Sequence, residues 1–199
     1  MSGSVTFGSF NSPAKVTPEV LATWAEILRL VPGSRLILKY RGLDDRGTAE
    51  RYLRLFADLE VKPAQIELRG WSPYVQTLAE YNEIDLALDP YPFCGATTTC
   101  EALWMGVPVV TCPMETFASR QTLSILSNIG LTETVASDPS HYVQLAVGMA
   151  HDLPHLAELR MGLRQQMTKS PLCDASRFAA SFMQATRDIW RRWCQTEGC

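Results

Sequence analysis

Residues 89–104 read Asp-Pro-Tyr-Pro-Phe-Cys-Gly-Ala-Thr-Thr-Thr-Cys-Glu-Ala-Leu-Trp, and the rest of the chain is organised around them. They follow the apolar run 84–88, which is typical of a buried strand, and two prolines and a glycine break the chain before a hydroxyl-rich helix start. The first N–H groups of a helix lack partners within it, and the helix dipole favours negative charge there. The stretch therefore predicts an anion site. Glu101, one turn further in, suits a pair of sugar hydroxyls, and phosphate with ribose indicates a nucleotide.

Strand-like and helix-like segments alternate along the 199 residues. This alternation predicts an α/β fold with a Rossmann-like, doubly wound parallel sheet of six strands. We expect this unit to span residues 1–168 and a C-terminal helical segment to span residues 169–199. The expected strands are 5–10, 35–40, 65–68, 84–88, 107–111 and 132–136.

The strand order of a Rossmann sheet predicts where a ligand binds. The strand order reverses between the first and fourth strands of the sheet. Ligands bind in the crevice outside the carboxyl ends of the strands at that point. The loops there are 9–15 and 89–98, so topology leads independently to the opening stretch and adds Lys15. The first loop lacks the G-x-G-x-x-G pattern, and the chain has no Walker sequence, which argues against the usual dinucleotide fingerprint and against a P-loop NTPase.

The composition argues against nucleic acids, membranes and metal ions as binding partners. The net charge is −3 and Lys and Arg form no runs, which argues against nucleic-acid binding. No apolar run of 18 residues and no signal peptide is present, so we expect a cytoplasmic protein with no membrane partner. The six cysteines form no C-x-x-C pair and no recognised zinc spacing. We therefore expect reduced thiols and no metal site.

Three segments resemble one known family. The most specific is the block Thr-Thr-Thr-Cys-Glu-Ala-Leu-Trp-Met-Gly-Val-Pro-Val at residues 97–109; residues 7–11 with Lys15, and residues 170–190, are similar to the same family. The chain is identified as a member of the O-GlcNAc transferase/SPINDLY glycosyltransferases, resembling the C-terminal catalytic lobe of bacterial members. The resemblance implies a GT-B fold and a UDP-sugar as donor. Within this family the implied UDP-sugar is UDP-GlcNAc. It also implies transfer with inversion to a protein Ser or Thr hydroxyl, with no metal or other cofactor.

The resemblance further implies that this chain is the donor-binding lobe alone. An N-terminal lobe with an acceptor-side histidine, and the TPR repeats that hold a protein acceptor, lie outside this sequence. In GT-B enzymes the final helix crosses back to the first lobe. Part of the apolar stripe of that helix is then expected to be exposed, and we expect self-association through it; the stripe contains Phe178, Phe182, Ala185, Ile189 and Trp193, with Trp190 beside it.

Several residues match family positions at the donor. Lys15 matches the lysine that contacts the diphosphate and is the candidate catalytic residue. Thr97 and Thr98 match threonines at the diphosphate, although a threonine at a helix start also serves as a cap. Glu101 matches the acidic residue that holds the ribose, and a first-turn Glu also favours the helix dipole. Ser12 aligns with a polar position near the diphosphate.

Other positions depart from the family pattern. Ala96 lies where animal members carry a histidine beside the diphosphate, and Thr77 lies where relatives carry a histidine that stacks on uracil. Tyr74 replaces a common lysine, and Ser72 is placed to present backbone groups to a base edge. The base is therefore open between UDP and GDP, since SPINDLY relatives use GDP-fucose.

Two functions remain open from the sequence. One is the donor lobe of an inverting glycosyltransferase that modifies protein hydroxyls. The other is a non-catalytic nucleotide-sugar-binding regulatory module, which the departures at Thr77 and Ala96 favour slightly.

Overall fold

Five parallel strands form the sheet in the computed structural model, which describes residues 4–197. The strands are β1 Thr6–Ser9, β2 Arg35–Lys39, β3 Ile66–Arg69, β4 Leu86–Leu88 and β5 Val109–Val110. Their order in the sheet is β3-β2-β1-β4-β5. Phe7 of β1 pairs with Leu36 on one side and with Leu86 on the other. The reversal predicted between the first and fourth strands is therefore present.

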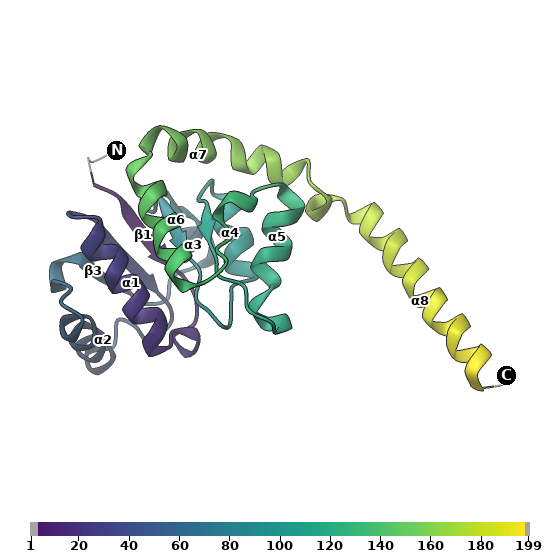
Figure 1. Cartoon of the computed structure of the whole chain (residues 1–199), viewed down its shortest axis with the longest axis horizontal. Coiled ribbons are helices and arrows are strands. Elements are labelled where there is room, and N and C mark those ends of the chain that lie inside the picture. The colour runs from purple at the N-terminus through teal and green to yellow at the C-terminus, as the bar shows by residue number, and fades with distance from the viewer. Residues whose placement is uncertain (1–3, 198–199) are drawn as a thin grey trace.

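Helices cover both faces of this sheet (Figure 1), as a doubly wound fold requires. The helices are α1 Pro18–Leu30, α2 Arg46–Asp58, α3 Tyr74–Glu80, α4 Thr97–Trp104, α5 Gln121–Ile129, α6 Pro139–His151, α7 Leu153–Thr168 and α8 Ala175–Glu197. Buried side chains of α1, α2 and α6 pack on one face, and those of α4, α5 and α7 pack on the other.

Strand β2 shows why two separate cores form. Successive side chains of a strand point to opposite faces, so Leu36 and Leu38 enter the core under α1 and α6 while Ile37 enters the core under α4 and α7. All three side chains are buried. A strand that is apolar on both faces is typical of a parallel sheet covered on both sides.

The predicted sixth strand is wrong in extent. Residues 132–136 form a 3-10 turn, Thr132–Thr134, followed by a single bridge between Thr111 and Val135. The N–H of Val135 bonds back to the carbonyl of Thr132 within the turn, so it cannot join a ladder. Two backbone hydrogen bonds join this segment to Thr111, the residue after β5: Thr111 N–H donates to Thr134 O, and Ala136 N–H donates to Thr111 O.

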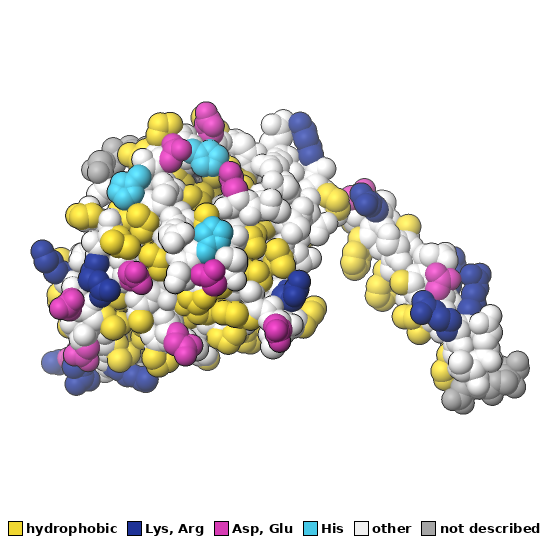
Figure 2. Space-filling model, viewed as in Figure 1, with side chains coloured by type: hydrophobic (Ala, Val, Ile, Leu, Met, Phe, Trp, Pro, Cys, Tyr) yellow, Lys and Arg dark blue, Asp and Glu magenta, His cyan; other side chains and the backbone are white. Residues whose placement is uncertain are grey.

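The last helix, α8, projects away from the rest of the molecule (Figure 1). A row of apolar side chains lies along the face seen in Figure 2, and the large ones of this helix are exposed. They include Phe178, Phe182, Met183, Ile189, Trp190 and Trp193. Among the helices of residues 4–197, none is long and apolar enough to cross a membrane.

Candidate functional site

The loops that follow β1 and β4 meet at Asn11. The Oδ1 atom of Asn11 accepts a hydrogen bond from Lys15 Nζ at 3.3 Å and another from Thr98 Oγ1 at 3.1 Å. Lys15 Nζ also donates to the carbonyl of Cys94 at 2.8 Å. The structure thus brings Lys15 and Thr98, both predicted from the sequence, to the same edge of the sheet.

The Lys15 ammonium group is held by two hydrogen bonds, fewer than the three it can donate. Its ammonium group lies 4.4 Å from the centroid of the Phe93 ring, and its side chain is half-buried. An ammonium group has three N–H donors, of which two are directed at Asn11 and Cys94. One donor therefore remains for a ligand at this edge.

A buried carboxylate, Asp89, fixes the loop between β4 and α4. Its Oδ1 atom accepts from Gly95 N–H at 2.6 Å, and its Oδ2 atom accepts from the Thr111 hydroxyl at 2.8 Å. Burial raises the pKa of Asp89 to about 6, against the hydrogen bonds from Thr122, Thr111 and Gly95. Because the Gly95 N–H points inward, an anion at this edge would be bound by the N–H groups of the residues that follow.

The start of α4 is left open. Ala96 is the residue before the helix, and no side chain in residues 4–197 caps it. Thr97 is exposed and Thr98 is half-buried, whereas Thr99 is buried and bonds the Thr122 hydroxyl at 3.0 Å. The threonines therefore do not serve as a helix cap, and the first N–H groups of α4 stay available for an anion.

A pocket of about 490 Å³ lies beside this edge, between the ends of β2 and β3 and the helices α3 and α4. Three predicted residues, Ser72, Thr77 and Glu101, line it together. Its other lining residues are Phe10, Lys39, Tyr40, Arg41, Gly70, Trp71 and Tyr74. Phe10 also lines a small cavity that contains Asn11 and Thr98, so the pocket adjoins the anion edge.

Glu101 is half-buried in the wall of this pocket. Burial raises the pKa of Glu101 above its ordinary value, and the Tyr74 hydroxyl partly offsets that rise. In return, the charge of Glu101 raises the pKa of Tyr74. A carboxylate in this setting can accept two hydroxyl hydrogen bonds from one ligand.

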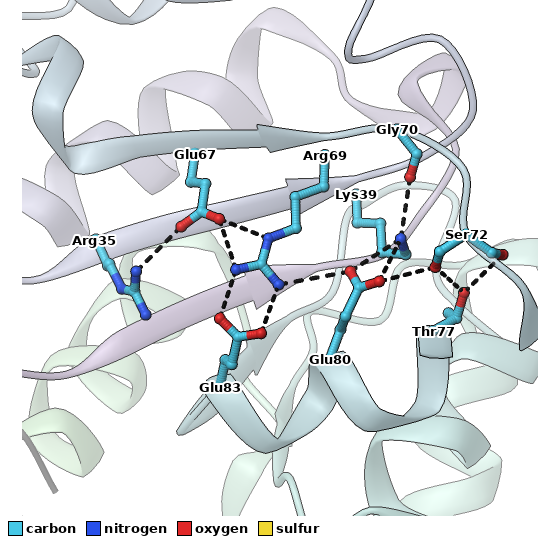
Figure 3. A network of polar contacts seen from close by, with 9 residues as sticks. All are labelled: Arg35, Lys39, Glu67, Arg69, Gly70, Ser72, Thr77, Glu80 and Glu83. Atoms are coloured by element: carbon cyan, nitrogen blue, oxygen red, sulfur yellow. Dashed lines mark hydrogen bonds and ion pairs between the residues drawn. The ribbon is translucent and has the colours of Figure 1, made fainter. Parts of the chain in front are cut away.

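Polar contacts connect the ends of β2 and β3 with α3 (Figure 3), and Lys39, Gly70, Ser72 and Thr77 among these residues also line the pocket. Lys39 Nζ lies 2.9 Å from Glu80 Oε2, and their side chains are only 6% and 11% exposed. The Ser72 hydroxyl donates to Glu80 Oε1 at 2.8 Å and lies 2.9 Å from Thr77 Oγ1. The Ser72 hydroxyl is thus held by Glu80 and does not cap α3, which Pro73 precedes.

The remaining predicted residues lie away from the pocket. The carbonyl of Ser12 accepts the backbone N–H of Lys15 at 2.9 Å, which helps to fix the lysine loop. Thr97 lines a second groove, of about 440 Å³, which it shares with Glu101 and Tyr74. Roles for the Ser12 hydroxyl, Thr97 and Ala96 in ligand binding stay predictions.

Sequence reasoning missed four residues of this site: Asn11, Lys39, Trp71 and Asp89. Asn11 and Asp89 lie in the two loops that topology had singled out, so their polar side chains were available as a signal. Lys39 is the last residue of β2, and Trp71 lies just after β3. Both line the pocket, but the sequence prediction placed the site only at the carboxyl ends of the first and fourth strands. Within residues 4–197, no three His, Cys, Asp or Glu side chains gather as potential metal ligands.

Comparison with known proteins identifies the family. Residues 2–182 match the model of glycosyl transferase family 41. The chain belongs to glycosyl transferase family 41. The SPINDLY protein of Petunia hybrida, named a probable UDP-N-acetylglucosamine–peptide N-acetylglucosaminyltransferase, is 41% identical over 96% of this chain. The UDP-N-acetylglucosamine–peptide N-acetylglucosaminyltransferase of Caenorhabditis elegans is 31% identical over 96% of it.

This family 41 chain spans about a fifth or less of such relatives, 21% of the Petunia protein and 16% of the Caenorhabditis protein. A mutant of the O-GlcNAc transferase of Thermobaculum terrenum has a TM-score of 0.92 and 42% identity, with 96% of this chain and 37% of that chain covered. An Anabaena protein solved with UDP and glucose, at 13% identity and a TM-score of 0.64, shares the fold alone. The predicted family and α/β glycosyltransferase fold are confirmed.

Proposed function

We propose that this chain is the donor-binding lobe of an inverting glycosyltransferase that takes a UDP-sugar, UDP-GlcNAc, and modifies protein Ser or Thr hydroxyls. One observation carries the proposal: Lys15 and Thr98 meet at Asn11 beside the uncapped start of α4, and Glu101 lines the adjoining pocket. A cation and helix N–H groups suit a diphosphate, and the carboxylate suits a ribose.

The same arrangement supports a role for Lys15 in catalysis. When a glycosyl bond to a nucleoside diphosphate breaks, negative charge accumulates on the departing diphosphate. Preorganised donors aimed at developing charge lower the barrier, and here they are the Lys15 ammonium group and the N–H groups at the start of α4. Asn11 and the Cys94 carbonyl hold the ammonium group in place before the charge appears.

The acceptor is part of the proposal and involves the longer protein. The names of the Petunia and Caenorhabditis relatives specify a peptide as acceptor, and this chain spans 21% of the first and 16% of the second. We infer that an acceptor-side lobe and the TPR repeats expected from the resemblance bring the hydroxyl to the donor. This chain alone is then expected to bind the nucleotide without transferring a sugar.

Isothermal titration of the chain with UDP tests the donor site. We expect binding that weakens about ten- to hundredfold in Lys15→Met, because a charged hydrogen bond contributes about 1.5–3 kcal/mol. Lys169→Met is the matched control, since Lys169 is an exposed lysine at the end of α7. Equal affinities of the wild type, Lys15→Met and Lys169→Met would contradict the proposal.

The second function, a nucleotide-sugar-binding regulatory module, also predicts that the chain binds UDP, so this titration does not distinguish the two functions. Ala96 offers no side-chain donor to a diphosphate, and the Thr77 side chain has no ring to stack on a base. These two missing interactions support the alternative. Sugar transfer to a protein by the longer protein would exclude this alternative. Nucleotide binding by that protein without any transfer would favour it.

A further inference from the structure

Phe93 lies in the loop between β4 and α4 and covers one side of the Lys15 ammonium group. Lys15 Nζ lies 4.4 Å from the centroid of the Phe93 ring. A cation over the face of an aromatic ring, within about 6 Å of the centroid, is attracted by the negative charge of that face. Phe93 is 49% exposed, so burial of its own apolar surface contributes little to its position. The ring is therefore placed to act on Lys15 rather than to fill the core.

The backbone next to the ring is fixed by Cys94, which is buried. Cys94 N–H donates to the carbonyl of Ala118 at 3.1 Å, and Thr122 N–H donates to Cys94 Sγ at 3.3 Å. The Cys94 carbonyl in turn accepts from Lys15 Nζ at 2.8 Å. Because one buried residue anchors both, the Phe93 ring and the Cys94 carbonyl are held in fixed positions around the ammonium group.

We propose that Phe93 is a positioning residue, whose ring holds the Lys15 ammonium group by a cation–π contact at the place where that group meets the diphosphate of the donor. The inference rests on the proposed function, in which Lys15 binds the diphosphate. The Phe93 side chain has no polar atom and so offers the diphosphate no hydrogen bond of its own. Its effect on the diphosphate therefore passes through Lys15.

The ring adds to two hydrogen bonds that hold the lysine incompletely. The bond from Lys15 Nζ to Asn11 Oδ1 is 3.3 Å long, beyond the usual range of about 2.7–3.2 Å for an N–H···O bond. Immobilising a long, flexible side chain when a ligand binds weakens the affinity, and a side chain that is already held avoids this loss. Cation–π attraction acts on the charge as a whole and uses no particular N–H. The third N–H of Lys15 therefore remains for a phosphate oxygen while the ring stays in place.

The affinity of the chain for UDP, measured by titration calorimetry, tests the inference. In Phe93→Leu, which keeps an apolar side chain but loses the ring, we expect UDP to bind about two- to tenfold more weakly. Phe93→Tyr keeps the aromatic face, and its affinity is expected to stay within about twofold of the wild type. Phe117→Leu is the matched control with no loss expected, because Phe117 is 84% exposed and lies in the neighbouring turn Phe117–Ser119. An unchanged affinity in Phe93→Leu, or an equal loss in Phe93→Tyr or Phe117→Leu, would overturn the inference.

A second pair of variants shows whether the ring acts through the lysine. In Lys15→Met the ring has no cation to hold, so adding Phe93→Leu is expected to change the affinity for UDP by less than about twofold. Ligand-observed NMR measures the weak affinities of these two variants. A loss in this background as large as in the wild type would show that the ring acts on the nucleotide directly or on the loop, and it would overturn the positioning role.

NMR of the chain without nucleotide tests the contact itself. The ring current of Phe93 is expected to shift the signals of the methylene protons next to Lys15 Nζ upfield in the wild type and in Phe93→Tyr. This shift is expected to be lost in Phe93→Leu. Absence of the shift from the wild type would overturn the inference and leave the proposed function intact. Binding of neither UDP nor GDP by a wild type that shows the shift would contradict the proposed function, and the role of the ring in donor binding with it.

Discussion

At the scale of single residues, the site depends on side chains that hold other side chains. Asn11 accepts from Lys15 and Thr98 and so connects the two loops of the switch point. Lys15 and Thr98 could be predicted because topology placed their two loops at the same edge of the sheet, and Thr98 and Glu101 because both lie in the family block at residues 97–109. Asn11 was missed although its loop had been singled out, because an asparagine after a strand is typical of any turn and its contact with Thr98 crosses 87 positions of sequence.

Asp89 gives a prediction about pH. Its pKa in the folded chain is about 6, above the ordinary value of 3.8, because burial disfavours the charged form. The folded state therefore holds this proton more tightly than the unfolded state between pH 4 and 6. The contribution of Asp89 to the free energy of unfolding is then highest below about pH 4 and declines by up to about 3 kcal/mol as the pH rises through 6.

The comparison of wild type with Asp89→Asn isolates this contribution, because the asparagine has no charge to bury. Urea unfolding at pH 4 and at pH 7 measures the free energy of unfolding of both proteins. We expect the wild type to lose stability relative to Asp89→Asn on going from pH 4 to pH 7. A difference between the two proteins that is independent of pH would contradict the raised pKa.

At the scale of elements, the 89–96 loop is packed too tightly to admit a side chain at Gly95. A Cβ atom there would lie 2.6 Å from Thr99 Oγ1 and 2.8 Å from Thr98 Oγ1. In Gly95→Ala we expect a loss of about 1–3 kcal/mol of stability from overpacking. We also expect weaker UDP binding, because Thr98 must move away from Asn11.

A second glycine provides the control. Gly148 lies inside α6, and an added Cβ there would meet no described atom within 4 Å. Gly148→Ala is expected to stabilise the chain by about 0.5–1 kcal/mol, because glycine is unfavourable within a helix, and to leave UDP binding unchanged. Thermal unfolding and calorimetry of both variants measure the two effects. Similar behaviour of the two alanine variants would show that the loop is not the constraint we describe.

The elements also show how far the sequence predicts structure. Local sequence accounts for helix α1, because the Thr17 side chain accepts from Val20 N–H and a proline occupies the first helical position. The residues 132–136 were predicted as a strand from their composition, yet a local turn competes for the Val135 N–H. Short segments at the edge of a sheet are decided by such competition, which composition does not reveal.

At the scale of the whole molecule, the sheet order and its two helical layers follow from the alternation of segments and from the reversal at β1. The polar contacts behind the pocket wall do not follow from the alternation of segments. The Lys39–Glu80 contact joins positions 41 apart in sequence, and both residues look like ordinary surface charges when the sequence is read alone. The fold must place them before their burial and pairing become visible.

Helix α8 projects away from the body formed by the sheet and its covering helices. Its apolar face is exposed in the described structure, as the sequence stripe led us to expect. The division at residue 168 and self-association through this face stay predictions. The candidate site beside α3 and α4 lies on the body formed by the sheet and its covering helices, away from α8 in Figure 1.

A crystal structure of the chain with UDP tests the central claim most directly. We predict density for the diphosphate within hydrogen-bonding distance of Lys15 Nζ and of the first N–H groups of α4, with the ribose at Glu101 and the base in the pocket lined by Ser72 and Thr77. Density for UDP at another surface, with the start of α4 empty, would contradict the account.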